Sequence, residues 1–341
     1  LISEENELSQ LAEGLVEQPG ALKSGEPVKV MLNAGLSAEH EHPLGSRVDG
    51  VGLYRTEIPF MLQNGFPSEE EQVAQYQGML QLFVDKPVTL RTLDIGADKQ
   101  LPYMPISEEN PSLGWRGIRL TLDQPEIFLV QLRAMLRANV ASGNLNILLP
   151  MITSLEEIDE ARRLLDRAGR EVEEMLGYAI PRPRLGVMIE VPSMIFMLSH
   201  LRDRVDFVSV GTNDLTQYLL AVDRNNTRVA SIYDSLHPAV LRALHSIGQE
   251  ANRAGVELCL CGEMAGDPMC VVMLISMGYY HLSMNGRNVA RVKYLLRHID
   301  QSEAQELALR GLEAPHTSEV RQLIAAFMER RGLGGLIRGG K

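Results

Sequence analysis

The sequence predicts a (β/α)8 barrel, an α/β fold of the TIM type, preceded by a short N-terminal helical extension. Three observations predict it: eight short β-rich apolar runs, longer amphipathic stretches between most of them, and a length of 341 residues. Strands that alternate with helices imply right-handed crossovers and a parallel sheet, and eight such units imply closure into a barrel. A doubly wound open sheet is the alternative, but no glycine-rich fingerprint follows the first run.

The predicted strands are runs of five or six residues rich in aliphatic and β-branched side chains. They cover residues 28–33, 50–54, 88–92, 146–150, 186–190, 206–210, 256–260 and 279–283. The clearest helix is 155–175, where apolar residues recur every three or four positions. Two further helical patterns lie within residues 302–331.

The domain organisation follows from these patterns. We expect an N-terminal helix and linker over residues 1–25, the barrel over 26–333, and a flexible, glycine-rich basic tail over 334–341. The first residue, Leu1, is not a methionine, so we expect the sequence to be a piece of a longer chain.

Composition narrows the classes of partner. The chain has 33 Lys and Arg residues against 44 Asp and Glu residues, a formal charge of -11, which argues against nucleic acid or an anionic membrane as a general partner. It has no apolar run long enough to cross a bilayer. Its three cysteines, Cys259, Cys261 and Cys270, suit neither a disulfide framework nor the usual zinc spacing, which favours a reducing cytoplasm.

Chemically reactive side chains follow the predicted strands at their carboxyl ends. In a parallel barrel these ends and the loops after them form the active site. The residues at these positions are Arg55, Arg91 with Asp94, Glu190, Asn213 with Asp214, Cys261 with Glu263, and Asn285.

Each of these residues also has an ordinary structural interpretation. A single arginine at a strand end often forms a surface ion pair, and Asn213 with Asp214 could cap the helix that follows. Cys261 could be a small buried hydrophobe, and Glu190 could pair with a neighbouring base. It is the joint occurrence at one predicted end of the barrel that favours a functional site.

Together these side chains suit the chemistry of a phosphorylated carboxylate. Glu190 and Asp214 offer hard oxygen ligands for Mg2+ or Mn2+. Arg55, Arg91 and Arg224 offer planar sets of donors that match phosphate and carboxylate oxygens. Cys261 could donate a proton to a carbanion or enolate. The residues alone therefore predict a metal-assisted enzyme that acts on a small phosphorylated or carboxylated substrate.

Six motifs around these positions resemble enzyme I of the phosphoenolpyruvate-dependent phosphotransferase system, and most closely its nitrogen-related form. The resemblance runs in order over about residues 28–300. The motifs are GLYRTE at 52–57, LRTLDIGADK at 90–99, ENPSLGWR at 109–116, GVMIEVP at 186–192, GTNDLTQY at 211–218 and CGEMAGD at 261–267.

The resemblance implies a C-terminal phosphoenolpyruvate-binding barrel that forms a homodimer and requires Mg2+. Carried over position by position, it implies the following roles. Phosphoenolpyruvate would be held by Arg55, Arg91, Asn213, Asp214 and Arg224; Mg2+ would be bound by Glu190 and Asp214; and Cys261 would protonate the enolate to give pyruvate.

Members of the resembled family pass the phosphoryl group to a histidine on a separate N-terminal domain and then to a histidine-containing phosphocarrier protein. None of the eight histidines here lies in the glycine-rich Ser/Thr-His motif of that domain. His40 and His42 lie in an acidic stretch, and His237, which precedes a proline, suits a capping or packing role better than a catalytic one. We therefore expect this chain to bind substrate and metal without completing the phosphotransfer alone.

Two other functions are compatible with the sequence. The chain could be a regulatory module whose dimerisation responds to phosphoenolpyruvate. It could also come from another barrel enzyme of phosphoenolpyruvate or pyruvate. A pyruvate phosphate dikinase would carry nucleotide-binding segments elsewhere, and a carbon–carbon lyase would not be expected to share residues 211–218 in full.

Overall fold

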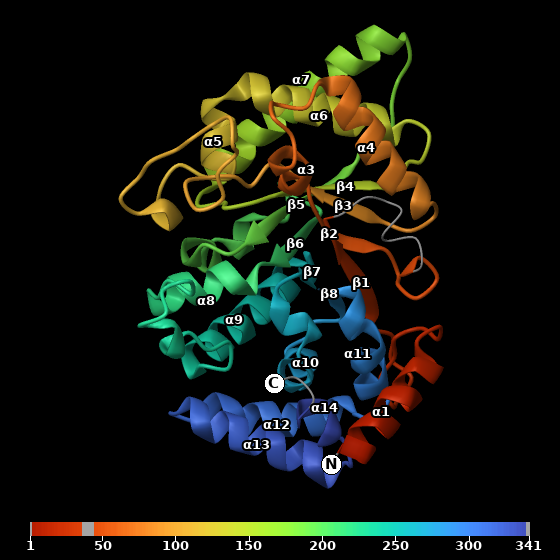
Figure 1. The fold of residues 1–341 in the computed structure, drawn as a ribbon, viewed down its shortest axis with the longest axis vertical. Coiled ribbons are helices and arrows are strands. Elements are labelled where there is room, and N and C mark those ends of the chain that lie inside the picture. The colour runs from red at the N-terminus through yellow and green to blue at the C-terminus, as the bar shows by residue number, and fades with distance from the viewer. Residues whose placement is uncertain (1, 36–43, 339–341) are drawn as a thin grey trace. The chain divides into compact units, whose positions relative to one another are not determined.

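The computed structural model describes residues 2–35 and 44–338 (Figure 1). Its eight strands form one closed barrel in chain order, and the paired strands run parallel, which confirms the predicted fold class. Every strand overlaps a predicted run. The strands are β1 (Lys29–Ala34), β2 (Val51–Arg55), β3 (Val88–Arg91), β4 (Leu145–Leu149), β5 (Arg184–Ile189), β6 (Phe207–Val210), β7 (Glu257–Leu260) and β8 (His281–Met284).

Packing divides the chain into two compact units. The first unit comprises residues 1–32, 46–49 and 210–341, and the second comprises residues 33–45 and 50–209. Each unit is described by itself below.

The second unit contains strands β2 to β5, most of β6 and the helices that lie between these strands. Its α-helices are α3 (Glu57–Met61), α4 (Glu69–Leu82), α5 (Ile118–Asp123), α6 (Pro125–Asn139) and α7 (Leu155–Leu176), and its short 3-10 helices are η2 (Pro111–Leu113), η3 (Pro192–Phe196) and η4 (Leu198–His200). Helix α6 packs against both α4 and α7. The strands are buried along nearly their whole length, as expected where helices cover a parallel sheet.

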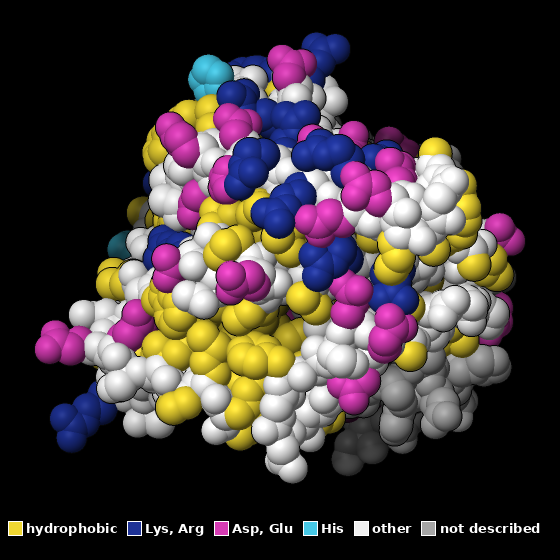
Figure 2. All heavy atoms as spheres, turned by 90° about the horizontal axis from the view of Figure 1, so that it is seen from above, with side chains coloured by type: hydrophobic (Ala, Val, Ile, Leu, Met, Phe, Trp, Pro, Cys, Tyr) yellow, Lys and Arg dark blue, Asp and Glu magenta, His cyan; other side chains and the backbone are white. Residues whose placement is uncertain are grey.

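The outer surface of these helices carries charges of both signs. Arg133 bridges Glu69 of α4 and Glu171 of α7, with N–O distances of 2.6 and 2.7 Å, and Arg137 also reaches Glu69. Figure 2 shows Lys and Arg side chains interspersed with Asp and Glu on one face of the molecule, rather than a uniformly basic surface. These pairs are only partly buried, and pairs near the surface contribute little stability each, so the packed helix faces beneath them supply most of the stability.

The first unit contains β7, β8 and most of β1. Its α-helices are α1 (Ile2–Leu15), α8 (Thr212–Leu220), α9 (Pro238–Ala254), α10 (Pro268–Ser276), α11 (Val289–Leu296), α12 (Gln301–Glu313), α13 (Thr317–Arg330) and α14 (Gly335–Arg338), and its 3-10 helices are η5 (Ala230–Ile232), η6 (Glu263–Gly266) and η7 (Gly286–Asn288). The predicted N-terminal helix is α1, and α12 and α13 are the two helices predicted near the C-terminus. Helix α1 packs against α11 and α14 (Figure 1).

A buried lysine fixes the segment that follows α1. The ammonium group of Lys293 in α11 donates hydrogen bonds to the carbonyl oxygens of Val16, Gln18 and Arg47, at 2.8, 2.8 and 2.6 Å. These three carbonyl oxygens replace the water that normally surrounds a lysine ammonium group, so the buried charge is stabilised. The same hydrogen bonds hold the backbone at these three residues in place. The end of the predicted helix and the start of the predicted linker within residues 1–25 are therefore tied to α11.

The C-terminal tail differs from the prediction in its described part. Residues 335–338 form helix α14, with Leu336 only 3% exposed, whereas the composition predicts a flexible segment. Arg291 donates to the carbonyl oxygen of Leu336, and Arg338 pairs with Glu329 of α13. Glycines lower helix propensity, but burial of an apolar side chain and these ties outweigh that preference.

Two other expectations concern cysteine and histidine. All three cysteines are free thiols, which confirms that no disulfide framework exists. His237 caps helix α9, because its Nδ1 accepts a hydrogen bond of 3.0 Å from the backbone N–H of Ala239, and this confirms the capping role. His40 and His42 lie outside the described residues. Across the described ranges, no helix combines the length and apolar character needed to span a bilayer.

Candidate active site

Arg55 and Arg91 end two neighbouring strands of the second unit. They are paired in the register of β2 and β3, so both follow the sheet to its carboxyl edge. Arg91 is buried and forms ion pairs with Glu57 and with Asp94, the latter at 3.3 Å between Nη1 and Oδ2. Arg55 is half-buried, and its side chain makes no hydrogen bond or ion pair with any residue in the described ranges. Arg91 is therefore fixed in place, whereas Arg55 is not held by an ion pair with any of the described residues.

Asp94 lies at the centre of a buried charge network. Its carboxylate is 1% exposed and lies 3.5 Å from the Lys99 ammonium and 3.4 Å from the Arg116 guanidinium, in addition to Arg91. Burial raises the pKa of Asp94, but the positive charges of Lys99, Arg91 and Arg116 outweigh burial and hold that pKa well below its usual range. Asp94 is thus a permanent anion that orients three cationic side chains.

The backbone at Arg91 is held by a second, uncharged network. The hydroxyl group of Thr56 donates to the carbonyl oxygen of Arg91 at 2.7 Å, and the amide of Gln131 donates to that same hydroxyl at 3.0 Å. The side-chain carbonyl of Gln131 accepts a bond of 2.8 Å from the N–H of Leu93. Because these groups are buried and satisfied by one another, they restrict the end of β3 to one geometry.

Glu190 follows β5 in the same unit and is also buried. It is 1% exposed, and its carboxylate accepts a hydrogen bond of 2.7 Å from the N–H of Met151, the second residue after β4. Met151 has a φ of 58°, a conformation that is costly for a side chain other than glycine and that is found most often at functional sites. The strained backbone turns this N–H towards the carboxylate.

Glycine at position 117 leaves room for Met151 and Asp94, the two neighbouring residues that a larger side chain there would meet. Gly117 has a φ of 55°, and a Cβ atom there would lie 3.1 Å from the side chain of Met151 and 3.2 Å from Oδ1 of Asp94. Met151 and Asp94 therefore both lie close to this residue. Within the second unit, the structure brings the predicted residues Arg55, Arg91 and Glu190 to the ends of β2, β3 and β5.

In the first unit, Asp214 lies in the first turn of α8. It is 8% exposed and pairs with Arg224, with 3.0 Å between Oδ1 and Nη1. The N–H of Arg224 also donates to Oε1 of Gln217, at 3.2 Å. The guanidinium of Arg224 thus places a positive charge beside this carboxylate at the start of α8.

Asn213 and Cys261 are joined through the backbone of the same unit. The N-cap of α8 is Gly211, and the side chain of Asn213 accepts a hydrogen bond of 3.0 Å from the N–H of Glu263. Cys261 is 4% exposed and lies 3.7 Å from the carbonyl oxygen of Val210, which also accepts from the Cys261 N–H. Asn213 thus links α8 to the loop after β7, instead of serving as a simple helix cap.

Tyr233 adds an aromatic hydroxyl to this group. It donates a bond of 3.1 Å to the carbonyl oxygen of Asn213. Burial raises the pKa of Tyr233, Arg224 opposes that rise, and Glu263 and Asp214 add to it. The hydroxyl therefore stays protonated and acts as a donor over the neutral range.

Several residues of these networks carry no role in the sequence prediction. Glu57, Lys99, Arg116 and Met151 are in this class, although the first three lie inside the quoted motifs. The signal for Lys99 and Arg116 is the charge content of residues 90–99 and 109–116, since the first of these segments also contributes Leu93 and Ile95 to a buried apolar cluster. Met151 gives no signal in the sequence, because its role depends on a backbone angle.

Each unit therefore carries carboxylates, arginines and hydrogen-bond donors at or just after the carboxyl ends of its strands. Fixed guanidinium groups suit phosphate and carboxylate oxygens, and buried carboxylates suit a hard divalent cation. In a closed parallel barrel, active sites lie at these positions. The chain matches the family model of the PEP-utilising enzymes, PEP-binding domain, over residues 9–301, and it belongs to that family.

Known proteins similar to this chain agree with that assignment. It is 78% identical over 340 residues to a protein of Salmonella typhimurium named "Phosphoenolpyruvate-dependent phosphotransferase system", and the alignment covers 100% of this chain and 46% of that protein. It is 39% identical over 305 residues to the phosphoenolpyruvate-protein phosphotransferase of Staphylococcus carnosus, covering 89% of this chain and 53% of the relative. The chain thus spans about half the length of these curated relatives.

A solved structure supports the fold alone. The malate synthase of Haloferax volcanii, described as a lead(II) complex, matches with a TM-score of 0.50 at 13% sequence identity, covering 91% of this chain and 88% of that protein.

Proposed function

We propose that this chain is the phosphoenolpyruvate-binding domain of a phosphoenolpyruvate-protein phosphotransferase. The observation that carries the proposal is the arginine pair Arg55 and Arg91, backed by a buried charge network, in a chain of the PEP-binding family. Phosphoenolpyruvate presents a phosphate and a carboxylate, and planar guanidinium groups bind both with paired hydrogen bonds.

Arg55 and Arg91 of the second unit would contribute to binding in different ways. Arg91 cannot move freely because Glu57 and Asp94 hold it, so it offers a preorganised positive charge. Arg55 makes no such contacts among the described residues, so ligand oxygens would be its main partners. Asn213, Asp214 and Arg224 of the first unit complete the proposed substrate-binding set.

Glu190 and Asp214 fit a Mg2+ ion by the chemistry of their donors. Both are buried carboxylates, 1% and 8% exposed, and hard oxygen donors are what Mg2+ prefers. When bound, the ion would neutralise charge on the phosphoryl oxygens. Mn2+ shares this preference for oxygen ligands and is the expected substitute.

Cys261 would supply the proton that completes pyruvate. When the phosphorus–oxygen bond of phosphoenolpyruvate breaks, the phosphoryl group leaves for a histidine nitrogen and the electron pair stays on the enolate oxygen. The methylene carbon of the enolate then forms a bond to the thiol proton, and the sulfur is left as a thiolate. Cys261 suits this role because its thiol is nearly excluded from solvent.

The accepting histidine would lie on a separate phosphohistidine domain of the full-length protein, from which a histidine-containing phosphocarrier takes the phosphate. We also infer a cytoplasmic location, where the three free thiols stay reduced, and a role in nitrogen regulation, from the resemblance to the nitrogen-related form.

We further infer that this domain forms a homodimer. The inference rests on the resemblance to enzyme I, and the second unit exposes apolar side chains that an interface could cover, among them Phe196 at 82% and Leu62 at 80%. Sedimentation of the chain with and without phosphoenolpyruvate tests this. If the dissociation constant of the dimer is the same with and without phosphoenolpyruvate, ligand-controlled dimerisation is contradicted. The proposed catalytic function is not affected by that result.

Calorimetric titration with phosphoenolpyruvate, with and without Mg2+, tests the binding function. We expect saturable, Mg2+-dependent binding. Arg55→Ala should weaken it about 10- to 100-fold, because charge-assisted hydrogen bonds are worth about 1.5–3 kcal/mol.

Arg163→Ala is the matched control. Arg163 is exposed on α7 and pairs only with the neighbouring Glu160 among the described residues, so its loss should leave the affinity unchanged. Absence of Mg2+-dependent binding, or equal effects of the two substitutions, contradicts the proposal.

A further inference from the structure

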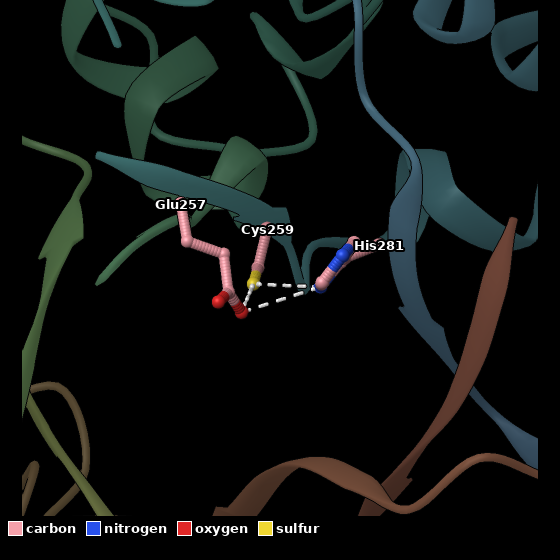
Figure 3. A group of neighbouring side chains, drawn as sticks. All are labelled: Glu257, Cys259 and His281. Carbon is pink, nitrogen blue, oxygen red and sulfur yellow. Dashed lines mark hydrogen bonds and ion pairs between the residues drawn. The ribbon is translucent and has the colours of Figure 1, made fainter. Parts of the chain in front are cut away.

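A cluster of three potential metal ligands lies at the beginning of β7 and β8, apart from every residue assigned above. Glu257 and Cys259 are two positions apart on β7, so their side chains project from the same face of the strand. The parallel register pairs Leu260 with Leu282, which brings His281 beside Cys259. Figure 3 shows the three side chains pointing towards one another.

The distances in this cluster match those around a tetrahedral ion. Sγ of Cys259 lies 3.8 Å from Oε1 of Glu257 and 3.8 Å from Nδ1 of His281, and the last two atoms are 3.4 Å apart. In a tetrahedral zinc site, bonds of about 2.0–2.3 Å place the ligand atoms roughly 3.3–3.6 Å from one another. One ion could therefore bind all three atoms after shifts of a few tenths of an ångström.

The chemistry of the three ligands selects the kind of ion. Thiolate and imidazole are soft or borderline ligands, which favour Zn2+ over Mg2+ or Ca2+. Three protein ligands leave a fourth position for water, as in many non-structural zinc sites. The prediction that these cysteines lack zinc spacing considered cysteine ligands alone, whereas here the partners of Cys259 are a histidine and a glutamate.

The exposure of the cluster permits an ion to enter. The side chains of Glu257 and His281 are 35% and 25% exposed, and Cys259 is half-buried. By contrast, Cys261 and Cys270 are buried, at 4% and 2% exposure. A metal ion added to the folded protein would thus reach Cys259 before it reached the other two thiols.

We propose that Glu257, Cys259 and His281 form a binding site for one Zn2+ ion, distinct from the proposed Mg2+ site. Binding replaces the thiol proton of Cys259 with a sulfur–zinc bond and releases that proton to the buffer. The ion links the first residues of β7 and β8. This inference does not depend on the proposed function.

Competition of the full chain with a chromophoric chelator for Zn2+ tests the site, and Co2+ serves as a spectroscopic probe. We expect one ion per chain, proton release on binding, and a thiolate-to-cobalt absorption band. Cys259→Ser and His281→Gln should each weaken Zn2+ binding about a hundredfold or more, because even residues that only orient ligands contribute about 10- to 100-fold. Glu257→Gln should weaken it less, since the amide oxygen can still coordinate weakly.

The matched control is Cys270→Ala, which removes a different buried thiol and should leave Zn2+ affinity unchanged. Far-ultraviolet circular dichroism establishes that each variant is folded. The proposal is overturned if Cys259→Ser or His281→Gln binds Zn2+ as tightly as the unmodified chain does. It is also overturned if Co2+ gives no thiolate-to-cobalt absorption band. Because phosphoenolpyruvate binding with Mg2+ is a separate readout, failure of one site does not imply failure of the other.

Discussion

Arg91 illustrates how single residues acquire function in this chain. Its guanidinium is buried beside two carboxylates, and its carbonyl oxygen accepts from Thr56, so both its charge and its position are fixed. Such a residue has a structural role besides its proposed role in binding, since its removal takes one of the positive charges away from two buried carboxylates. Arg55 lacks this double role, which makes it the better probe of ligand binding.

Asp94→Asn should destabilise the fold at neutral pH by about 3–5 kcal/mol, the typical cost of removing one partner from a buried ion network. The folded-state pKa of Asp94 lies below the unfolded value of about 3.9, so its ionisation stabilises the fold fully above that value. This contribution is lost as the pH falls towards the folded pKa. When urea unfolding is measured from pH 7 to pH 3, the difference in free energy of unfolding between Asp94→Asn and the unmodified chain should therefore become smaller.

The control for this substitution is Asp159→Asn. Asp159 is exposed on α7 and pairs with Arg204 at 2.9 Å, so its loss should cost little at any pH. The assigned network is contradicted if the free energies of unfolding of Asp94→Asn and the unmodified chain differ little at pH 7. It is also contradicted if their difference grows in acid.

Cys261→Ala should separate proton transfer from binding. The affinity for phosphoenolpyruvate should stay nearly unchanged, because the thiol acts only while the enolate exists. Exchange of the methyl hydrogens of pyruvate with D2O, followed by NMR, should slow by about 100-fold or more. Cys270→Ala should exchange normally, since that thiol lies in α10, where burial raises its pKa well above the usual value. Unaltered exchange in Cys261→Ala removes the proton-donor role.

At the scale of single residues, the sequence predicted positions better than partners. Arg55, Arg91 and Glu190 lie at or just after the strand ends where the pattern put them, because strand periodicity determines which residues end a strand. It did not predict that Arg91 would pair with Glu57 or that Met151 would donate to Glu190. Those contacts depend on the path of the long loop after β3 and on a positive φ, which no local pattern encodes.

At the scale of elements, helix boundaries follow local capping chemistry. Helix α4 begins with a capping box in which Oγ of Ser68 accepts from the N–H of Glu71 at 3.1 Å, and Oε2 of Glu71 accepts from the N–H of Ser68 at 2.8 Å. These reciprocal bonds satisfy two backbone donors that the helix itself leaves without partners. Helix α4 packs against α6, which lies next to α7, so its start helps to position this layer.

Ser68→Ala should lower the free energy of unfolding by about 1 kcal/mol, because it removes the acceptor of this capping box. Ser302→Ala is the matched control, since Ser302 is exposed inside α12 and makes no hydrogen bond through its side chain among the described residues. In urea unfolding, the free energy of unfolding should fall for Ser68→Ala. For Ser302→Ala it should stay within about 0.5 kcal/mol of that of the unmodified chain. Equal effects would contradict the cap.

Long periodic elements were the most predictable. Helix α7 runs from Leu155 to Leu176 against a predicted 155–175, because its apolar stripe repeats over six turns. Helix α14 was not predicted, since a four-residue helix has too few positions for a periodicity. It forms through contacts with α13 and with Arg291, which are distant in sequence.

At the scale of the whole molecule, the closed barrel followed from counting alternating units, and the family from motifs at the strand ends. The division into two units could not be predicted, because it depends on which side chains pack together and not on any break in the sequence pattern. The candidate zinc ligands were missed for a similar reason, since His281 joins Cys259 only through the register of β7 and β8.

The most direct test of the central claim is a crystal structure of the chain grown with phosphoenolpyruvate and Mg2+. We predict density for one metal ion bound by Glu190 and Asp214, with the substrate's phosphate and carboxylate on Arg55, Arg91 and Arg224. Phosphoenolpyruvate bound elsewhere, or an ion that contacts neither carboxylate, would contradict it.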